Sequence, residues 1–362
     1  MGVCYAQGVK SLDEEMAGLV SAWFDRCARD LPWRARRGRR DAYRSLVSEF
    51  MLMQTQVSRV LERFEPFVER FPTVEALATA DEDAVLAAWS GLGYYRRARM
   101  LHRAAKMIGD EFDGRVPGDA AALRRLPGVG RYAAGAMASI VFGRAEAMVD
   151  GNVARVLARV DGAGGALDME RAWRRSGALV ALAERPGVFN EGLMELGATV
   201  CTPRGPECGR CPLAKLCKAR AMGREAEIPE PKAGVKRRAL FAATVVAQDG
   251  RGRVLVEQRA ERGLWAKMWQ APTIEGDDGH AGARALAGLV QAESVELAGS
   301  FDFVTTHRQV HFAVYRGQGA RAGDGRRWVS RRALARLAVS NAHRRVFVEA
   351  GVALTEAVSS RA

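Results

Sequence analysis

The sequence lacks several features that mark membrane and secreted proteins. It has no uninterrupted apolar run of about 18 residues, the length that a membrane-spanning helix requires. Its first residues show no apolar segment ahead of a small-residue cleavage site, so we expect no signal peptide. Cysteine is scarce, at 6 of 362 residues, which argues against a small fold held together by disulfides. The length instead predicts two domains or three.

Acidic residues are also in deficit. The chain has 42 Asp and Glu against 55 Lys and Arg, which gives a formal net charge of +13 and a pI of about 10.0. A charge of this sign favours a polyanionic partner, and nucleic acid is the common one. Because an Arg-rich composition can also reflect a genomic bias, the charge needs the support of specific motifs.

Four of the few cysteines are clustered in a short segment, CTPRGPECGRCPLAKLC. They are Cys201, Cys208, Cys211 and Cys217, at the spacing C-x6-C-x2-C-x5-C. Four-cysteine zinc sites usually contain two C-x2-C knuckles, and this segment has one, so the spacing favours a [4Fe–4S] cluster with zinc as the alternative. Prolines inside the segment predict a loop around the bound group. Cys4 and Cys27 lie outside it.

The rest of the sequence divides into a helical part and a later part with strands. Apolar periodicity predicts helices over 12–27, 43–71, 74–80, 83–89, 96–112, 120–126, 132–142 and 153–160, with a basic loop at 34–40. Cys27 falls on the apolar face of the first helix, so we expect a buried thiol. The charged, proline-containing stretch near 226–237 predicts a linker. Beyond it we expect a hairpin of strands 240–247 and 254–258, more strand over 301–315, and helices from Ser330 and Asn341.

The segment Leu126-Pro-Gly-Val-Gly130 lies between two predicted helices. Gly128 and Gly130 would leave backbone N–H groups open at a helix start, an arrangement that binds a phosphate oxygen. Leu126 and Val129 complete the motif. An ordinary connection between two helices is the alternative reading of these residues.

Together with the cysteines, these residues make the chain resemble the helix–hairpin–helix DNA glycosylases that carry an iron–sulfur cluster, and within them the MutY-type adenine DNA glycosylases. The resemblance covers about residues 10–220 and rests on an ordered series: LPWR at 31–34, SEFMLMQTQV at 48–57, WSGLGYYRRAR at 89–99, LPGVGRY at 126–132, VDGNVARVL at 149–157 and NEGLMELGATVCTP at 190–203. It implies an all-α catalytic domain that removes adenine mispaired with 8-oxoguanine or guanine.

Breaking an N-glycosidic bond requires a proton for the leaving base and a negative charge beside the sugar, which two carboxylates can supply. Glu49 lies in an otherwise apolar helix, where burial should raise its pKa. Asp150 precedes a helix, where we expect it to stay ionised. A solvated helix position and a helix N-cap are the respective alternatives. The resemblance makes Glu49 the acid and base and Asp150 the group that stabilises the sugar cation.

The resemblance assigns further residues. Tyr132 and Asn152 would orient the two carboxylates, and Gln54 and Tyr94 would wedge the DNA apart. Residues that would contact the flipped adenine are Arg29, Leu31, Trp33 and Glu191. Relatives that cut the DNA strand carry a lysine where this chain has Tyr132, so we expect a monofunctional glycosylase. Met53 departs from the glutamine that is usual in the family.

Residues from about 236 to 350 resemble the Nudix-like domain of the same family, through VLVEQR at 254–259 and GLWAKMWQAP at 263–272. The helix that would carry Mg²⁺-binding glutamates lacks them, so we expect this α+β domain to bind rather than to hydrolyse. The family reads 8-oxoguanine with a Phe-Ser-His loop. Here Thr305, Thr306 and His307 take its place, so the aromatic residue is missing.

The resemblance therefore implies a catalytic domain with the cluster loop at 1–225, a linker at 226–237, a Nudix-like domain at 238–352 and a tail at 353–362. It implies a monomer that binds double-stranded DNA with A:8-oxoguanine or A:G mispairs, in the cytoplasm of a bacterium and associated with the nucleoid. The alternatives are a thymine or oxidised-pyrimidine glycosylase of the endonuclease III superfamily, and an iron–sulfur DNA sensor without catalysis.

Overall fold

The computed structural model describes residues 11–34, 40–231, 236–323 and 325–353. Cys4, most of the basic loop at 34–40, part of the predicted linker and nearly all of the predicted tail lie outside these residues. Within the described residues, no helix is long and apolar enough to cross a membrane. The predicted domain boundaries remain predictions.

The helical part contains thirteen numbered α-helices, a π-helical segment and a short 3-10 helix within the described residues. They are α1 (Leu12–Cys27), α2 (Ala42–Leu52), α3 (Val57–Leu61), α4 (Phe64–Arg70), α5 (Val74–Ala78), α6 (Glu82–Ala88), α7 (Arg96–Glu111), α8 (Ala120–Arg125), α9 (Arg131–Ala136), η1 (Met137–Val141), α10 (Gly151–Asp161), α11 (Met169–Leu182), α12 (Pro186–Thr199), η2 (Cys208–Arg210) and α13 (Lys218–Ala221). The predicted helix at 43–71 is three helices, because Gln54 adopts a left-handed backbone (φ 58°) just after α2.

Among its described residues, the later part contains two sheets and three helices. The elements are β1 (Arg238–Ala247), β2 (Val254–Gln258), β3 (Trp269–Gln270), β4 (Thr273–Gly276), α14 (Ala283–Val290), β5 (Ser294–Val304), β6 (Arg308–Gln318), β7 (Arg326–Val329), α15 (Arg331–Arg336) and α16 (Asn341–Glu349). Ser330 and Ser340 cap the last two helices through their side chains. The strand order is β4-β1-β6-β5 in one sheet and β3-β2-β7 in the other.

The predicted hairpin of β1 and β2 is wrong. β1 pairs with β4 on one side and with β6, in parallel, on the other, so both of its edges are occupied. β2 pairs with β3 and β7 in the second sheet. The turn at 249–252 does form, but it joins the two sheets through a single bridge, Gln248 to Val254.

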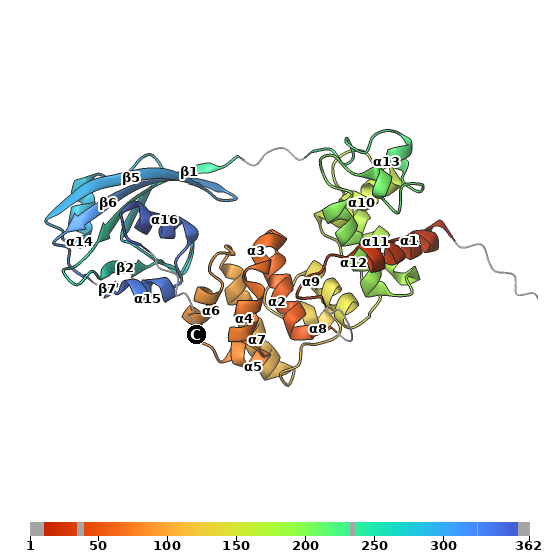
Figure 1. Cartoon of the computed structure of the whole chain (residues 1–362), viewed down its shortest axis with the longest axis horizontal. Coiled ribbons are helices and arrows are strands. Elements are labelled where there is room, and N and C mark those ends of the chain that lie inside the picture. The colour runs from red at the N-terminus through yellow and green to blue at the C-terminus, as the bar shows by residue number, and fades with distance from the viewer. Residues whose placement is uncertain (1–10, 35–39, 232–235, 324, 354–362) are drawn as a thin grey trace, which may run out of the picture. The chain divides into compact units, whose positions relative to one another are not determined.

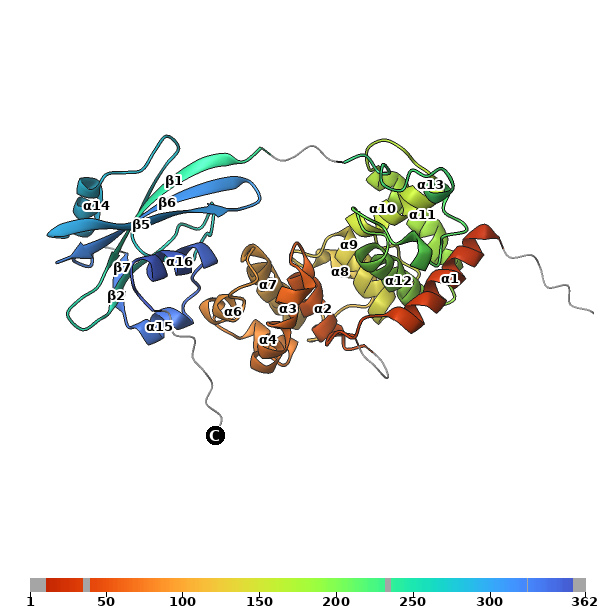
Figure 2. The same cartoon turned by 45° about the horizontal axis from the view of Figure 1, so that its top comes forward.

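β1 lies at the centre of the first sheet and is buried on both faces. Ala242 and Val246 pack into a core with Phe312 and with Phe347 of α16, whereas the alternate residues of β1 pack with Leu286 of α14. α14 and α16 therefore cover opposite faces of this sheet, as the turned view shows (Figure 2).

The chain separates into two compact units, each made of more than one segment. The first is Met1–Met53, Phe71–Ala78 and Arg103–Ala233, and the second is Gln54–Arg70, Thr79–His102 and Gly234–Ala362. In the first unit, α1, α10, α11 and α12 surround one core, which includes Trp23, Val153, Leu179 and Phe189 (Figure 1). α11 and α12 were not among the predicted helices.

Cys27 is exposed at the end of α1, so the expected buried thiol is wrong. The helix buries Met16, Val20, Trp23 and Phe24, whereas its last three residues are exposed because the core ends at Phe24. The periodic pattern is correct for the helix but does not extend to its final position.

Candidate active site and cluster site

Glu49 lies on α2 among buried neighbours. Val47, Ser48, Phe50 and Met51 are buried, and Glu49 itself retains only partial exposure. Burial is the main cause that raises the pKa of the Glu49 carboxyl to about 7. The carboxylates of Glu191 and Asp150 contribute to this rise, and the charge of Arg40 opposes it. The site thus holds a carboxyl group that is partly protonated near neutral pH.

Asp150 is the N-cap of α10. One carboxylate oxygen accepts a hydrogen bond from the backbone N–H of Val153 (2.7 Å), and the other accepts one from Asn152 Nδ2 (3.0 Å). Asp150 therefore is a helix N-cap, as the alternative reading expected. Its charge also raises the pKa of Glu49 and of Tyr132, which a helix cap alone would not require. Capping and catalysis are compatible here, since both need a carboxylate that accepts hydrogen bonds.

Tyr132, near the start of α9, lies beside the two carboxylates. Its hydroxyl donates to Met194 Sδ (3.3 Å). Burial raises its pKa well above the ordinary value, and the charges of Glu49, Asp150 and Glu191 add to the effect. The phenol therefore stays neutral as a donor near the acid pair.

An ion-pair network that the sequence analysis missed supports this site. Glu191 and Glu195 lie one turn apart on α12 and are both buried. Arg34 bridges them, to Glu191 Oε1 (3.1 Å) and Glu195 Oε2 (2.9 Å). Arg29 adds a two-pronged contact to Glu195 (2.6 and 2.9 Å), and Arg40 pairs with Glu191 (2.5 Å). Two glutamates at i and i+4 in the otherwise apolar NEGLMELG required cationic partners, and that signal could have revealed the network.

The four residues expected to contact adenine have different surroundings. Leu31 and Trp33 are buried, at 6% and 8% exposure. Arg29 and Glu191 are both in the ion-pair network, but each pairs with a different partner. Because the charge of Glu191 raises the pKa of Glu49, this part of the set lies within electrostatic reach of the acid.

The hairpin at 126–130 alternates between the core and the solvent. Leu126 and Val129 are buried, whereas Gly128 and Gly130 are exposed. Gly128 has φ 86°, a conformation that favours glycine, and a Cβ on Gly130 would meet nothing within 4 Å. Packing within the chain therefore does not require a glycine at position 130. The space beside this residue is open, so an external group could approach its backbone.

Gln54 and Tyr94 belong to the second unit and share an uncommon feature. Both have a positive φ, at 58° and 47°, although neither is glycine. Both are exposed. The Tyr94 hydroxyl lies 2.6 Å from Thr306 Oγ1, so the structure brings together two residues that the sequence analysis selected from opposite ends of the chain. They line one open cavity of about 1190 Å³ with Trp265 and Phe303.

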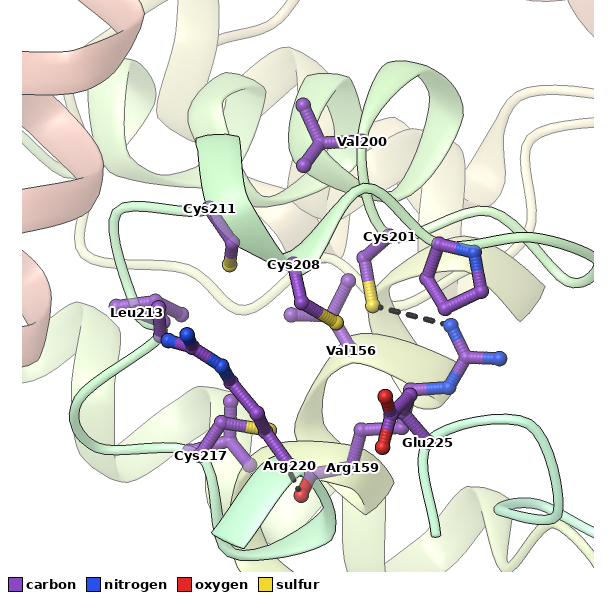
Figure 3. A pocket seen from close by; sticks show the side chains of 13 residues that line it. Val156, Arg159, Val200, Cys201, Cys208, Cys211, Leu213, Cys217, Arg220 and Glu225 are labelled. Carbon is purple, nitrogen blue, oxygen red and sulfur yellow. Dashed lines mark hydrogen bonds between the residues drawn. The ribbon is translucent and has the colours of Figure 1, made fainter. Parts of the chain in front are cut away.

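The four predicted cysteines direct their sulfur atoms into one pocket (Figure 3). Burial raises the pKa of Cys211 to about 11, and the neighbouring cysteines also raise it. Arg159 donates to Cys201 Sγ (3.3 Å), and the Cys217 thiol lies 3.4 Å from the Arg159 carbonyl oxygen. Burial and neighbouring cysteines also raise the pKa of the Cys208 and Cys217 thiols. A shared cationic group would favour their thiolates, which are the metal-binding form. Among the described residues, no three Cys, His, Asp or Glu form a group that could hold a metal ion.

Arg155 connects the pocket to the carboxylates. Its guanidinium donates to the Cys201 carbonyl (2.9 Å), to Asn152 Oδ1 (2.9 Å) and to the Gly197 carbonyl (2.8 Å). Since Asn152 in turn donates to Asp150, one chain of hydrogen bonds runs from the cysteine loop to the carboxylate.

This fold and this site define a class, the base excision DNA repair glycosylases built on a helix–hairpin–helix. Residues 47–176 match the family described as HhH-GPD superfamily base excision DNA repair protein, and residues 243–349 match the NUDIX domain. A solved structure of a thermostable thymine-DNA glycosylase is similar, with a TM-score of 0.52 and 28% identity, over 58% of this chain and 97% of that one.

Curated relatives place the chain more narrowly. The adenine DNA glycosylase of Homo sapiens is 34% identical over 91% of this chain and 73% of its own length. That of Mycobacterium tuberculosis is 43% identical over 66% of this chain and 77% of its own length. The chain belongs to the adenine DNA glycosylase family, with a helical glycosylase domain followed by a Nudix-like domain.

Proposed function

We propose that the protein is a monofunctional DNA glycosylase that hydrolyses the N-glycosidic bond of adenine opposite 8-oxoguanine or guanine. The observation that carries this proposal is the pairing of Glu49, whose pKa is raised to about 7, with Asp150, whose oxygens are held by two donors. Two carboxyl groups in such different surroundings can divide the work of acid and anion.

In this mechanism the adenine leaves the base stack before reaction, at a cost of a few kcal/mol. Glu49 donates its proton to adenine N7 as the bond between N9 and the sugar C1′ breaks, and the bonding electrons leave with the base. The Asp150 carboxylate stabilises the cationic sugar, directly or through a transient ester. Water then adds its oxygen to C1′ and returns a proton to Glu49, which restores the acid.

The absence of a suitable amine supports hydrolysis without strand cleavage. Position 132 is a tyrosine, and Ala154 stands where the resemblance to the MutY-type glycosylases would place a lysine. A phenol cannot form a Schiff base with the opened sugar. We therefore propose an abasic site as the product.

The C-terminal domain would recognise the opposing base. Thr306 and His307 are exposed at the tip between β5 and β6, and Thr306 lies beside Tyr94. Gln54 and Tyr94 would hold the gap that the flipped adenine leaves. Met53, which replaces a polar residue, would make the neighbouring surface less polar.

The four cysteines would hold a [4Fe–4S] cluster, which would supply a structural fixing point for the loop at 201–217. Their spacing supports a cluster over zinc, and Arg159 would donate to a ligand sulfur. Iron and sulfide analysis of the purified protein tests this, and stoichiometric zinc instead would contradict it.

We further propose that the protein acts as a monomer in the bacterial nucleoid.

A single-turnover assay tests the activity. Duplexes would carry A opposite 8-oxoguanine, A opposite G and T opposite G, with and without alkali to reveal abasic sites. We expect adenine release that requires alkali for strand scission and that is lost in Glu49→Gln. Thymine release, or scission without alkali, would overturn the proposal.

A further inference from the structure

The turn between β5 and β6 is closed by a side chain rather than by its backbone alone. Val304 and Gln309 form the last strand pair; the tip is Thr305, Thr306 and His307, and Arg308 begins β6. The Thr305 N–H donates to the Arg308 carbonyl (2.9 Å). In the return direction, the Arg308 N–H donates to Thr305 Oγ1 (3.0 Å). The hydroxyl thus occupies the acceptor position that the Thr305 carbonyl would fill in an ordinary hairpin turn.

The same hydroxyl is satisfied as a donor. Thr305 Oγ1 donates to the Arg308 carbonyl (3.0 Å). The hydroxyl therefore bonds to both the N–H and the carbonyl of Arg308. The Thr305 carbonyl, released from the turn, accepts a hydrogen bond from Arg237 Nε (3.0 Å). The His307 carbonyl accepts one from the backbone of Arg238 (3.1 Å). The start of β1 therefore holds the tip at two of its carbonyls.

We propose that Thr305 is the positioning residue that fixes the tip and presents the Thr306 hydroxyl to the opposing base. This inference rests on the proposed function, in which Thr306 reads 8-oxoguanine. Thr305 itself is half-buried and its hydroxyl is fully engaged by Arg308, so it has no donor left for a base. Thr306 is exposed, and its Oγ1 lies 2.6 Å from the Tyr94 hydroxyl.

This role explains how the chain dispenses with the aromatic residue of related loops. A phenylalanine at 305 has no hydroxyl and would have to fix the tip by packing alone. Threonine fixes it by two hydrogen bonds, one donated to the Arg308 carbonyl and one accepted from the Arg308 N–H. Serine preserves both bonds, whereas valine has nearly the shape of threonine and preserves neither. A comparison of the serine and valine variants at position 305 therefore separates the effect of hydrogen bonding from that of packing.

The test compares Thr305→Val with Thr305→Ser in the full-length protein. The first readout is amide hydrogen exchange at Arg308, which reports the turn directly. The second is the ratio of single-turnover rate constants, at subsaturating enzyme, for A opposite 8-oxoguanine over A opposite G. We expect Thr305→Val to lose protection at Arg308 and to lower this ratio about fivefold, the effect of roughly one lost hydrogen bond. Thr305→Ser should keep both close to wild type.

Unchanged protection in Thr305→Val would overturn the closure of the turn by the hydroxyl. Lost protection with an unchanged ratio would overturn its role in specificity. Thr305→Ala, read in the same two ways, guards against misfolding caused by a buried valine. A wild-type ratio near one would contradict the proposed reading of 8-oxoguanine by Thr306, and the exchange measurement would still decide whether Thr305 closes the turn.

Discussion

Single residues determine the chemistry of the site, and Glu49 shows how. Its carboxyl is placed by a helix that is otherwise apolar, within reach of two further carboxylates. Desolvation and like charge both favour the protonated form, so the acid remains available at a pH where an exposed glutamate would have lost its proton.

The rate of base excision should therefore fall as pH rises through about 7. The reactive form of Glu49 is protonated, and its pKa is raised to about 7. Above that value each unit of pH should reduce the single-turnover rate constant about tenfold. Rapid-quench measurements across this range test the prediction, and a rate that stays flat to well above pH 8 would contradict it.

The same group should make stability depend on pH. The folded state keeps the Glu49 proton to about 7, whereas the unfolded chain loses it near the ordinary value of 4.5. Folding is thus penalised increasingly between these values, by roughly 3 kcal/mol at most. Glu49→Gln cannot ionise, so it should be more stable than wild type above pH 7 and should lose that advantage below about pH 4.5. Denaturant unfolding at both ends of the range measures the difference.

Elements place these residues by close approach. α10 and α12 meet where Gly197 faces Asn152, and a Cβ at 197 would lie 2.7 Å from Asn152 Cβ. Because residue 197 has no side chain, α12 comes near enough to α10 for the Gly197 carbonyl to accept a hydrogen bond from Arg155.

Gly197→Ala should displace Asn152 and weaken both stability and catalysis. We expect a loss of about 1–3 kcal/mol, typical of overpacking, and a lower single-turnover rate constant. Gly177→Ala in α11 is the matched control, because a Cβ there meets nothing within 4 Å. Thermal unfolding and excision assays on both variants test the prediction. Equal behaviour of the two would show that the approach of the helices is not limiting.

The ion-pair network ties Arg29, Arg34 and Arg40 to α12. Burial alone would raise the pKa of Glu195, but hydrogen bonds from Arg29 and Arg34 outweigh it and lower the pKa to about 2. The stabilisation is present above the ordinary value of 4.5 and is lost as pH falls through 2.

Glu195→Gln should destabilise the protein by about 3–5 kcal/mol at neutral pH, because Arg34 is left buried without its full charge partner. The deficit should shrink at about pH 3, where the wild type has already lost part of the benefit. Denaturant unfolding of both proteins at the two pH values measures it. A deficit that is independent of pH would mean that shape, not charge, holds α12.

At the scale of the whole molecule, the net charge of +13 governs encounter with DNA. Lys and Arg that neutralise phosphates release counterions, so the affinity should fall steeply with salt. For Glu49→Gln bound to a duplex with A opposite 8-oxoguanine, we expect a loss of about a thousandfold or more between about 50 and 200 mM salt. Fluorescence anisotropy at several salt concentrations tests this. A shallow dependence would show that few basic residues contact phosphate.

Local sequence patterns sufficed to predict much of the fold. The first helix was predicted from the periodicity of its apolar residues between Leu12 and Cys27, because that pattern acts within a few residues. The hairpin of β1 and β2 was predicted incorrectly, because a turn signal specifies a reversal but not which strand will occupy an edge. Partners at β4 and β6 are separated from β1 by long stretches of chain.

The sequence by itself determined which functional groups the protein has: four cysteines at a characteristic spacing, two carboxylates, a glycine hairpin and an excess of positive charge. These are properties of residue type and of short spacing. Only the tertiary structure decided that Glu191 reaches Glu49, that Arg155 joins Asn152 to Cys201, and that Thr305 closes its own turn. Such interactions depend on burial and on side chains that folding brings close together, and neither is encoded at any fixed spacing along the chain.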